Sequence, residues 1–595
     1  MGKQHIAHMV RDRAARYGPR EAYRFTYGHE TDYQSYSWDV LIHNIDKVSC
    51  ALLAMGVGCE DNVGIYSDNR PEWTIADIAI LSLRAVVVPF YATSARQQLK
   101  YIIDETKMKI LFVGNSVQLE NALWALDNCE TLGKIIVFET EGSINRKNCI
   151  TWQNFCNLAD EEHHRLKLHQ ILEQAQADDL ATIVYTSGTT GEPKGVMLGH
   201  DNFMHIFEYH DARLDVRETD VSLCFLPLSH IFERCWTYYV FYRGAINVYL
   251  ENPKTVIEHL SIVKPTMMCA VPRFFEKTHE GIYTEAEKLS PLKQKIFNWS
   301  IAVGLRCIQY QEQRQELPIL LKTKRIMAEQ LVFKKLRTVF GGKIRFTPCA
   351  GAAISQELLR FFHGIGMFVT FGYGATETTA TVACFKTEDF DFTTCGTVLA
   401  GVDVKISEDG EIQVKGKSVF RGYYQKPEAT NKVLVDGWYK TKDKGFLTEK
   451  GDLVMTDRLD DLFKTSGGKF VSPQKVELLL GQDQFIQQVT IIGEKRKYVT
   501  ALIVPSFENL RAIAPTFGLN QLADEKIILQ QAVVDFMQAR LAKAQAELAS
   551  FERVIKFTLL PEPFSLENNT LTPSLKIRRK VIAQQYQEII EKMYE

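Results

Sequence analysis

The stretch ATIVYTSGTTGEPKG, residues 181–195, joins a short apolar run to a loop rich in glycine and hydroxyl side chains. The apolar run Ala181–Val184 predicts a strand that ends where the loop begins. Glycines let the backbone approach a polyanion, hydroxyl and amide groups donate hydrogen bonds, and Lys194 adds positive charge. Because open α/β sheets bind ligands at the carboxyl ends of their strands, the stretch predicts a phosphate-binding loop in an α/β protein.

Two other interpretations of this loop are weaker. A glycine-rich hairpin would explain the glycines, but not the crowding of Thr, Ser and Lys around them. A kinase-type P-loop requires the spacing G-x-x-x-x-G-K-[ST], which is not present because Lys194 stands between Pro193 and Gly195.

Apolar runs alternate with amphipathic stretches on both sides of the loop, which predicts β-α-β units around parallel sheets. The expected strands are 63–66, 85–89, 109–113, 134–138, 220–227, 266–271 and 343–350. An amphipathic stretch such as 73–83 is expected to form a helix between two of them. The predicted fold class is therefore α/β, with a large N-terminal domain of parallel-rich sheets.

A helical pattern replaces this alternation between Lys277 and Thr338, and we predict a helical insertion at about 277–340. This segment holds twelve Lys or Arg against six Glu, whereas the whole chain has a formal net charge of −2. A solvated helix face would explain the local positive charge. The alternative is attraction to an anionic membrane surface.

Short strands with glycine turns follow Thr397 and predict a β subdomain at about 397–458. A polar segment at 457–461 then precedes a mixed unit that is expected to end in a helix at 580–593. We place the main boundary near Asp460. The prediction is an N-terminal domain at 1–458 and a small, mobile α+β C-terminal domain at 459–595.

Composition excludes several functional classes. The 595 residues carry no overall basic field, which argues against a nucleic-acid binder. The 12 cysteines include no C-x-x-C pair, so we expect reduced thiols and a cytoplasmic protein. We find no apolar run long enough to span a membrane and assign no targeting segment. His200, His205 and His210 are spaced too evenly around a helix to form a zinc site.

Five further motifs follow the phosphate loop in order. They are GAA at 351–353, FGYGATET at 371–378, WYKTKD at 438–443, DRLD at 457–460 and LTPSLKIRR at 571–579. The aromatic side chain of the second motif suits a purine, and its glutamate suits a divalent cation bound by phosphates. The aspartate of the third motif can accept more than one hydrogen bond.

In this order the motifs resemble the adenylate-forming (AMP-binding) superfamily of acyl-CoA synthetases, luciferases and peptide-synthetase adenylation domains. The segments PLSHIFER at 227–234 and VPRFFEK at 271–277 are similar to those of its long-chain members. The chain therefore resembles a long-chain fatty acid–CoA ligase of the bacterial type.

The resemblance implies roles for individual residues. Phosphate contacts are implied for Thr186, Ser187, Gly188, Thr189, Thr190, Gly191 and Lys194. Adenine and ribose contacts are implied for Gly351, Ala352, Ala353, Gly372, Tyr373, Asp443 and Arg458, with the ring of Tyr373 stacked on adenine. The implied catalytic group comprises Lys576, Glu377, Thr376 and His230.

Within that group the expected tasks differ. Glu377 would help to hold Mg²⁺ through the phosphates, and Thr376 would contact the α-phosphate. Lys576 would neutralise charge that builds up at the phosphorus. We expect His230 to position the acyl site rather than to react.

Three further expectations concern the C-terminal domain and its boundary. Asp460 is implied as the hinge, and Gly467 and Gly468 are implied to lie near the pantetheine arm of CoA. The sequence departs from the family pattern at Lys442 and Asp457, where glycine is usual. A non-glycine residue at Lys442 is expected to shift the local backbone.

The implied reaction converts ATP, a fatty acid and CoA into acyl-CoA, AMP and diphosphate through an acyl-adenylate. The C-terminal domain would rotate between the two half-reactions. Three alternatives stay open: transfer of the acyl group to a carrier protein, a shorter or aromatic acid as substrate, and a non-catalytic acyl- or nucleotide-binding protein. The expected partners are these substrates, with peripheral contact at the inner face of a membrane as a further possibility.

Overall fold

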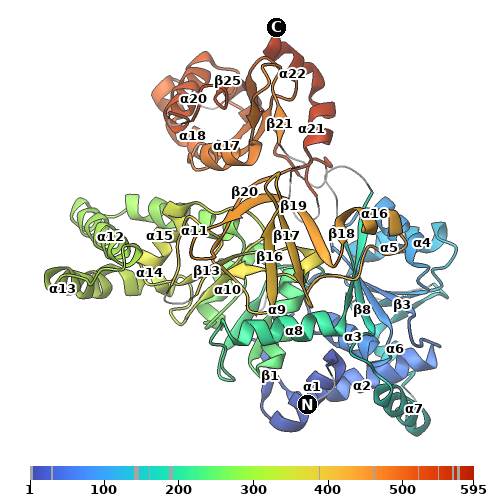
Figure 1. Ribbon diagram of the computed structural model, residues 1–595. Coiled ribbons are helices and arrows are strands. Elements are labelled where there is room, and N and C mark those ends of the chain that lie inside the picture. Colours follow the sequence, from blue (N-terminus) through green and yellow to red (C-terminus); the bar gives the residue numbers. More distant parts are fainter. Residues whose placement is uncertain are drawn as a thin grey trace.

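The computed structural model describes residues 4–27, 31–139, 146–159, 161–186, 192–386, 389–459, 462–519, 522–546, 548–565, 568–572 and 577–595. Two large sheets and a smaller antiparallel sheet form the body of the molecule, and a separate unit beyond β20 (Leu453–Arg458) contains the C-terminus (Figure 1). No helix in these ranges is long and apolar enough to cross a membrane.

A seven-stranded sheet with the order β7-β6-β5-β3-β4-β8-β9 carries the phosphate loop. Its strands are β7 (Cys149–Thr151), β6 (Lys134–Val137), β5 (Ile110–Val113), β3 (Asn62–Tyr66), β4 (Val86–Phe90), β8 (Leu180–Thr186) and β9 (Lys194–Gly199). All neighbouring strands are parallel except the β8–β9 pair. The helix α2 (Trp38–Ala54) precedes these strands, and the helices between them include α3 (Pro71–Ser82), α4 (Arg96–Thr106) and α5 (Ser116–Asn128).

The second large sheet is assembled from two four-stranded pieces. One has the order β10-β11-β1-β2, with β10 (Val221–Cys224), β11 (Ile246–Tyr249), β1 (Glu21–Phe25) and β2 (Gln34–Ser37). The other has the order β12-β13-β14-β15, with β12 (Thr347–Cys349), β13 (Val369–Tyr373), β14 (Ala383–Cys384) and β15 (Thr397–Val398). Met267 pairs in parallel with both Ser222 and Phe346 and so connects the two pieces.

Helices cover both faces of this second sheet. On one face, α8 (His200–Asp211) and α9 (Ile231–Tyr242) share a core with the seven-stranded sheet. The other face is covered by α11 (Pro272–Glu287), α12 (Pro291–Glu312) and α15 (Gln356–Gly364). Beyond α12 the chain continues as α13 (Ile319–Ala328), the π-helical turn η2 (Glu329–Phe333) and α14 (Lys334–Thr338).

Two smaller units follow. The antiparallel sheet contains β16 (Val402–Ile406), β17 (Glu411–Gly416), β19 (Trp438–Leu447), β18 (Leu434–Val435) and β20. The C-terminal unit has the hairpin of β21 (Phe463–Lys464) and β22 (Phe470–Val471), and a sheet of β23 (Ile486–Ile492), β24 (Val499–Pro505) and β25 (Val554–Leu559). Its helices include α17 (Pro473–Leu480), α20 (Gln531–Ala544), α21 (Arg579–Gln585) and α22 (Gln587–Tyr594).

The predicted α/β fold class is confirmed, and most expected strands lie within two residues of their predicted positions. Two details differ. Residues 266–271 form only isolated bridges at Met267 and Ala270. The segment lies between β10 and β12 without pairing continuously with either strand. The helix expected at 580–593 is interrupted at Tyr586 between α21 and α22.

One buried ion pair connects the two large sheets. Arg234 on α9 donates to the carboxylate of Asp77 on α3 with an Nε–Oδ2 distance of 3.0 Å, and both side chains are about 1% exposed. Its Nη1 also donates to Oγ1 of Thr182 on β8 at 2.7 Å. Tyr238 donates to the same carboxylate at 2.5 Å, and Trp73 lies 5.4 Å from the guanidinium carbon. The pair is therefore fully enclosed and well hydrogen-bonded.

Replacing Arg234 with Met should lower the free energy of unfolding by about 3–5 kcal/mol, because the carboxylate of Asp77 is left buried without its partner. The double variant Asp77→Leu/Arg234→Met should recover much of this loss. Urea unfolding followed by tryptophan fluorescence measures both. The control is Arg314→Met, which opens the exposed Arg314–Asp389 pair and should cost less than about 1 kcal/mol. Equal losses in R234M and R314M would contradict the assigned importance of the buried pair.

Candidate active site

The two ends of the phosphate loop are held by a strand pair. Thr186 is the last residue of β8 and Lys194 the first of β9, and the two are register partners in the antiparallel ladder. The predicted contacts Ser187, Gly188, Thr189, Thr190 and Gly191 lie outside the described residues. The loop therefore begins at the carboxyl end of a strand, as its sequence predicts.

Lys194 and Glu377 meet at Tyr423. The hydroxyl group of Tyr423 donates to Oε1 of Glu377 at 2.9 Å, and Nζ of Lys194 lies 5.0 Å from the centre of the tyrosine ring. Burial, together with the charge of Glu377, raises the pKa of Tyr423, so its hydroxyl stays protonated and remains a donor. A cation and a carboxylate are thus fixed on one aromatic side chain.

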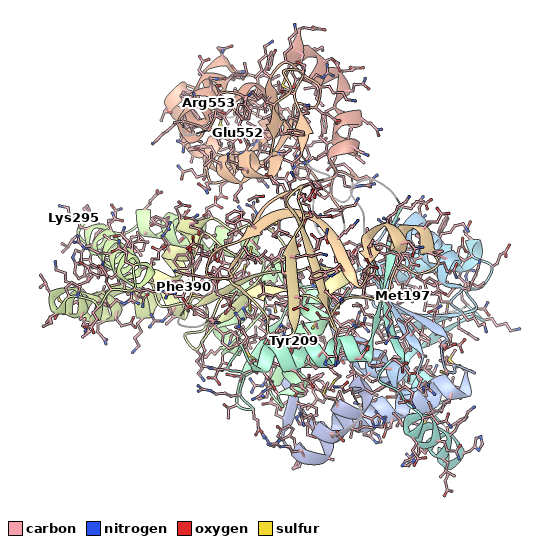
Figure 2. All side chains as sticks on the ribbon, viewed as in Figure 1. Met197, Tyr209, Lys295, Phe390, Glu552 and Arg553 are labelled. Carbon is pink, nitrogen blue, oxygen red and sulfur yellow. The ribbon has the colours of Figure 1, made fainter. Side chains whose placement is uncertain are left out.

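The backbone explains why Tyr423 lies there. The segment 420–424 runs beside β9, where Arg421 N donates to the carbonyl of Met197 at 3.0 Å and Tyr424 N to that of Gly195 at 2.8 Å. Phe420 N donates to the carbonyl of Glu377 at 2.8 Å. Figure 2 marks Met197 on this strand. The segment therefore fastens the Glu377 turn to the base of the phosphate loop.

A second cluster joins Tyr373, Asp443 and Arg458. Tyr373, at the end of β13, donates its hydroxyl to Oδ2 of Asp443 at 2.6 Å, and Arg458 Nε donates to Oδ1 at 2.8 Å. Asp443 is 3% exposed and pairs directly with Arg458 across β19 and β20. Burial raises the pKa of Tyr373, and the neighbouring carboxylate adds to the effect. The structure thus brings three predicted nucleoside-binding residues together.

The residue before Asp443 explains the departure from the family pattern. Lys442 has φ of 63°, in the left-handed region that favours glycine. Its N–H donates to Oε1 of Glu411 at 2.9 Å, and its carbonyl accepts from Leu459 N at 2.8 Å. Lysine therefore adopts the left-handed backbone that favours glycine at this position.

The GAA segment 351–353 follows β12 and is exposed. Gly351 has φ of 93°, so its backbone turns in a way that a larger residue would adopt only with strain. At the neighbouring strand, a Cβ on Gly372 would come within 2.7 Å of the carbonyl of Ala383. Both glycines are thus required by the backbone beside Tyr373.

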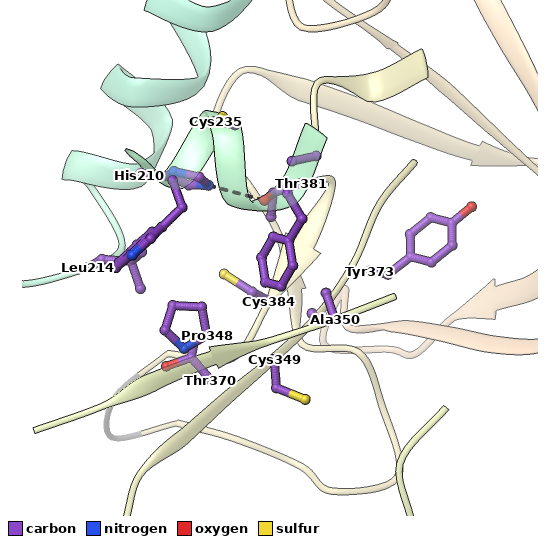
Figure 3. A pocket seen from close by; sticks show the side chains of 14 residues that line it. His210, Leu214, Cys235, Pro348, Cys349, Ala350, Thr370, Tyr373, Thr381 and Cys384 are labelled. Carbon is purple, nitrogen blue, oxygen red and sulfur yellow. Dashed lines mark hydrogen bonds between the residues drawn. The ribbon is translucent and has the colours of Figure 1, made fainter. Parts of the chain in front are cut away.

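A narrow apolar cavity of about 30 Å³ opens between β12, β13 and the helices α8 and α9 (Figure 3). It is lined at one end by Ala350, Gly372 and Tyr373. The rest of its lining includes Leu214, Phe232, Cys235, Trp236, Cys349 and Cys384. The hydrogen bond between His210 Nε2 and Thr381 Oγ1, 3.2 Å long, lies at its wall. The cluster of Tyr373, Asp443 and Arg458 therefore adjoins an apolar space.

His230 caps the helix that borders this cavity. Its Nδ1 accepts from Phe232 N at 3.2 Å, and its ring centre lies 6.4 Å from that of Tyr91. Three residues later, Glu233 is fully buried, and burial raises its pKa to about 8. His230 thus caps the first turn of α9, and its role beside an acyl group stays a prediction.

The remaining predicted residues are Gly467, Gly468, Asp460, Lys576 and Thr376. Gly467 and Gly468 lie in the exposed turn between β21 and β22, where Gly468 has φ of 80°. The hinge residue Asp460 and the lysine Lys576 lie outside the described residues. Thr376 begins the short 3₁₀ turn that carries Glu377.

Comparisons with known proteins agree with this geometry. Residues 10–424 match the AMP-binding enzyme family, and residues 460–595 match the AMP-binding enzyme C-terminal domain. The chain belongs to the AMP-binding enzyme family.

The alignments of this AMP-binding enzyme with its relatives cover nearly the whole chain. The long-chain-fatty-acid–CoA ligase FadD15 of Mycobacterium bovis is 31% identical over 93% of this chain and 91% of its own. Long-chain-fatty-acid–CoA ligase 5 of Rattus norvegicus is 29% identical over 97% of this chain and 85% of its own. Among solved structures, the anthranilate CoA ligase AuaEII superposes with a TM-score of 0.74 at 17% identity, covering 100% of this chain and 99% of the other. These matches confirm the predicted superfamily and fold.

Four residues that contact the candidate site or its neighbours were missed by the sequence analysis: Tyr423, Tyr101, Glu105 and Lys426. Lys426 Nζ donates to the hydroxyl of Tyr101 at 2.7 Å and lies 3.2 Å from Oε1 of Glu105, which also accepts from Tyr185. Lys426 further lies 3.8 Å from Oε2 of Glu192 in the loop motif. The one available signal was the aromatic pair at 423–424 after a glycine, which the sequence alone does not connect to Glu377.

Replacing Tyr423 with Phe should weaken the binding of ATP with Mg²⁺ about tenfold. The charged carboxylate of Glu377 then loses the hydrogen bond that the tyrosine hydroxyl donates to it. The ring beneath Lys194 is retained, so the change isolates the hydroxyl group. Isothermal calorimetry measures the dissociation constant. The matched control is Tyr424→Phe, whose hydroxyl contacts Asn62 instead, and which should leave binding unchanged. Unaltered binding in Y423F would show that Tyr423 does not position Glu377 for the nucleotide.

Proposed function

We propose that this protein is a long-chain fatty acid–CoA ligase. It joins ATP, a fatty acid and CoA to give acyl-CoA, AMP and diphosphate through an acyl-adenylate. The observation that carries the proposal is the 31% identity to a long-chain-fatty-acid–CoA ligase over 93% of the chain. The apolar cavity beside the Tyr373–Asp443 pair supports it, because an acyl chain and a nucleoside then meet at one point.

In the first half-reaction, the cluster around Asp443 holds the nucleoside and the cluster around Tyr423 holds the phosphates. The fatty carboxylate attacks the α-phosphorus of ATP, and diphosphate leaves toward the loop that begins at Thr186 and ends at Lys194. A fixed cation such as Lys194 stabilises the charge of the departing phosphates without reorganising. Thr376 and Glu377 lie on the same 3₁₀ turn, and in our proposal both act at the phosphates during this step.

Magnesium fits this site only in company with the nucleotide. Within the described ranges, no group of three or more His, Cys, Asp or Glu is arranged to hold a metal ion. Mg²⁺ is commonly held by one or two carboxylates together with substrate phosphates. Glu377, oriented by Tyr423, would be such a carboxylate, and the ion would supply charge neutralisation at the phosphate oxygens.

Asp443 retains capacity for the ribose. An ionised carboxylate has about four acceptor positions, and here Tyr373 and Arg458 each occupy one. The others are available to the two ribose hydroxyl groups. Arg458 then holds the carboxylate in a fixed orientation.

The acyl chain requires the cavity to widen. A volume of about 30 Å³ is room for one or two water molecules rather than for a long chain. The half-buried side chains Leu214 and Phe232 at the wall are the ones that must move. Binding of a long chain would therefore be coupled to side-chain rearrangement around α9.

The second half-reaction needs the C-terminal domain, residues 459–595. In our proposal this domain rotates about Asp460, withdraws Lys576 and presents Gly467 and Gly468 to the pantetheine arm. The thiolate of CoA then attacks the acyl carbonyl and displaces AMP. The separate hydrophobic clusters of the C-terminal unit support motion as a body.

The helical insertion is proposed to contact a membrane surface at which the fatty acid is held. The excess of Lys and Arg in this segment would provide the attraction, since anionic lipids bind basic surfaces.

Replacing Lys576 with Ala should abolish adenylation and largely spare thioester formation from supplied acyl-AMP, because the lysine acts only on the developing charge at phosphorus. Pyrophosphate exchange measures the first step, and thioester release from synthetic acyl-AMP measures the second. Lys580→Ala, an exposed position on the following helix, is the matched control. Equal loss of both steps in K576A would contradict this division.

A chain-length series should give a kcat/KM that rises about threefold to fourfold per added methylene group, as expected when each is buried in an apolar cavity. Leu214→Trp, which fills the cavity wall, should depress the values for long acids and spare short ones. Leu158→Trp, on an exposed site elsewhere, is the control. A maximum at short or aromatic acids would overturn the long-chain assignment.

Transfer to a carrier protein in place of CoA would favour the alternative acceptor.

A further inference from the structure

An apolar stripe lies exposed along α13 and the π-helical turn that follows it. Its members are Ile319, Leu320, Ile326, Met327 and Leu331, which we call the α13 stripe. Their side chains are between 84% and 46% exposed. At about 100° per residue, positions 319, 320, 326 and 327 fall on one side of the helix. The stripe is therefore continuous rather than scattered.

The same helix buries a different face. Leu321, Ala328, Val332 and Phe333 are buried in the core that includes α12. These residues account for the packing of α13 against the rest of the molecule. The α13 stripe is thus a second apolar face that the described residues leave uncovered, and single exposed apolar residues would not produce it.

Lysines border the stripe. Lys322 and Lys324 stand on α13 on either side of it, and Lys334 and Lys335 follow at the start of α14. Residues 319–338 hold six Lys or Arg against one Glu. Within the part of the chain that the structure describes, none of these four ammonium groups forms an ion pair within 4 Å; Arg337 is the ion-pair partner of Glu329, and the charge of Lys334 adds only to the lowering of the pKa of that carboxyl. The charge of the four lysines is therefore available to an external partner.

The position of α13 keeps this surface accessible. Figure 1 shows α13 at the outer end of the helical insertion, away from the C-terminal unit. Lys295, on the neighbouring helix α12, also points outward there (Figure 2). A flat surface can thus approach α13 without meeting the C-terminal unit.

We propose that the α13 stripe docks on an anionic lipid bilayer, with its apolar side chains in the interfacial region and the bordering lysines on the lipid phosphates. A helix with an apolar face flanked by lysines is the pattern of interfacial helices. This rests on the proposed function, because a long-chain fatty acid is enriched in the same bilayer. A second copy of this chain is a poorer occupant, since a symmetric contact would bring like-charged lysines together.

The test is co-sedimentation with vesicles of phosphatidylcholine containing about one third phosphatidylglycerol. The variant Ile319→Gln/Ile326→Gln/Met327→Gln should lower the partition coefficient at least about tenfold, because three apolar side chains leave the interface. Lys322→Glu/Lys335→Glu should lower it on these vesicles, and high salt should produce the same loss. Leu529→Gln/Ile555→Gln, at exposed apolar positions of the C-terminal unit, is the matched control and should bind as the unmodified protein does.

Two results would overturn the proposal. One is unchanged vesicle binding by the triple glutamine variant. The other is a concentration-dependent dimer, seen by analytical ultracentrifugation without lipid, that the triple variant abolishes, since the stripe would then bind a second copy. Ligase activity on fatty acid in detergent micelles is measured in parallel. Its absence in the unmodified protein would refute the proposed function, whereas its retention in the triple variant separates docking from catalysis.

Discussion

The buried ion pair between Asp77 and Arg234 is the constraint on which the site depends. Two charges withdrawn from water are tolerated only when their geometry and remaining hydrogen bonds are satisfied, so the pair permits one relative placement of α3 and α9. Through Thr182 it also includes β8, four residues before the phosphate loop begins. The start of the loop, the cap at His230 and the wall of the apolar cavity are thereby fixed to one another.

From this frame the site is assembled at the ends of strands from three different sheets. Thr186 ends β8 in the first sheet, Tyr373 ends β13 in the second, and Arg458 ends β20 in the third. Strand ends are rigid in position while their side chains remain accessible, which suits a site that must hold several substrate groups. Tyr423 connects two of these parts, because its hydroxyl group bonds to Glu377 and its ring lies beside Lys194.

The sequence predicted those features that depend on local pattern. Continuous apolar runs identified the buried strands β3 to β6, and the motif order identified Tyr373, Asp443 and Arg458, which the structure places in contact. It did not predict Tyr423, because its partner Glu377 is 46 residues away and no periodicity relates them. Arg234 was interpreted only as part of a segment beside the acyl site, since the sequence does not show that Asp77 lies opposite.

The α13 stripe was missed for a related reason. A helix with two apolar faces cannot be distinguished by composition from a helix that is buried on all sides. Only the packing against α12 shows which face is covered.

Asp457 shows how a departure from the family pattern can be compatible with the proposed rotation. Its carboxylate accepts a hydrogen bond from Ser472, across the boundary at Asp460, and burial raises its pKa. The clusters beyond that boundary consist of residues 463–594 alone, so no shared core has to separate when the C-terminal unit turns. A single hydrogen bond to a carboxylate contributes about 1.5–3 kcal/mol net. It can favour one orientation of the two parts, yet it is weak enough for substrate binding to reverse that preference.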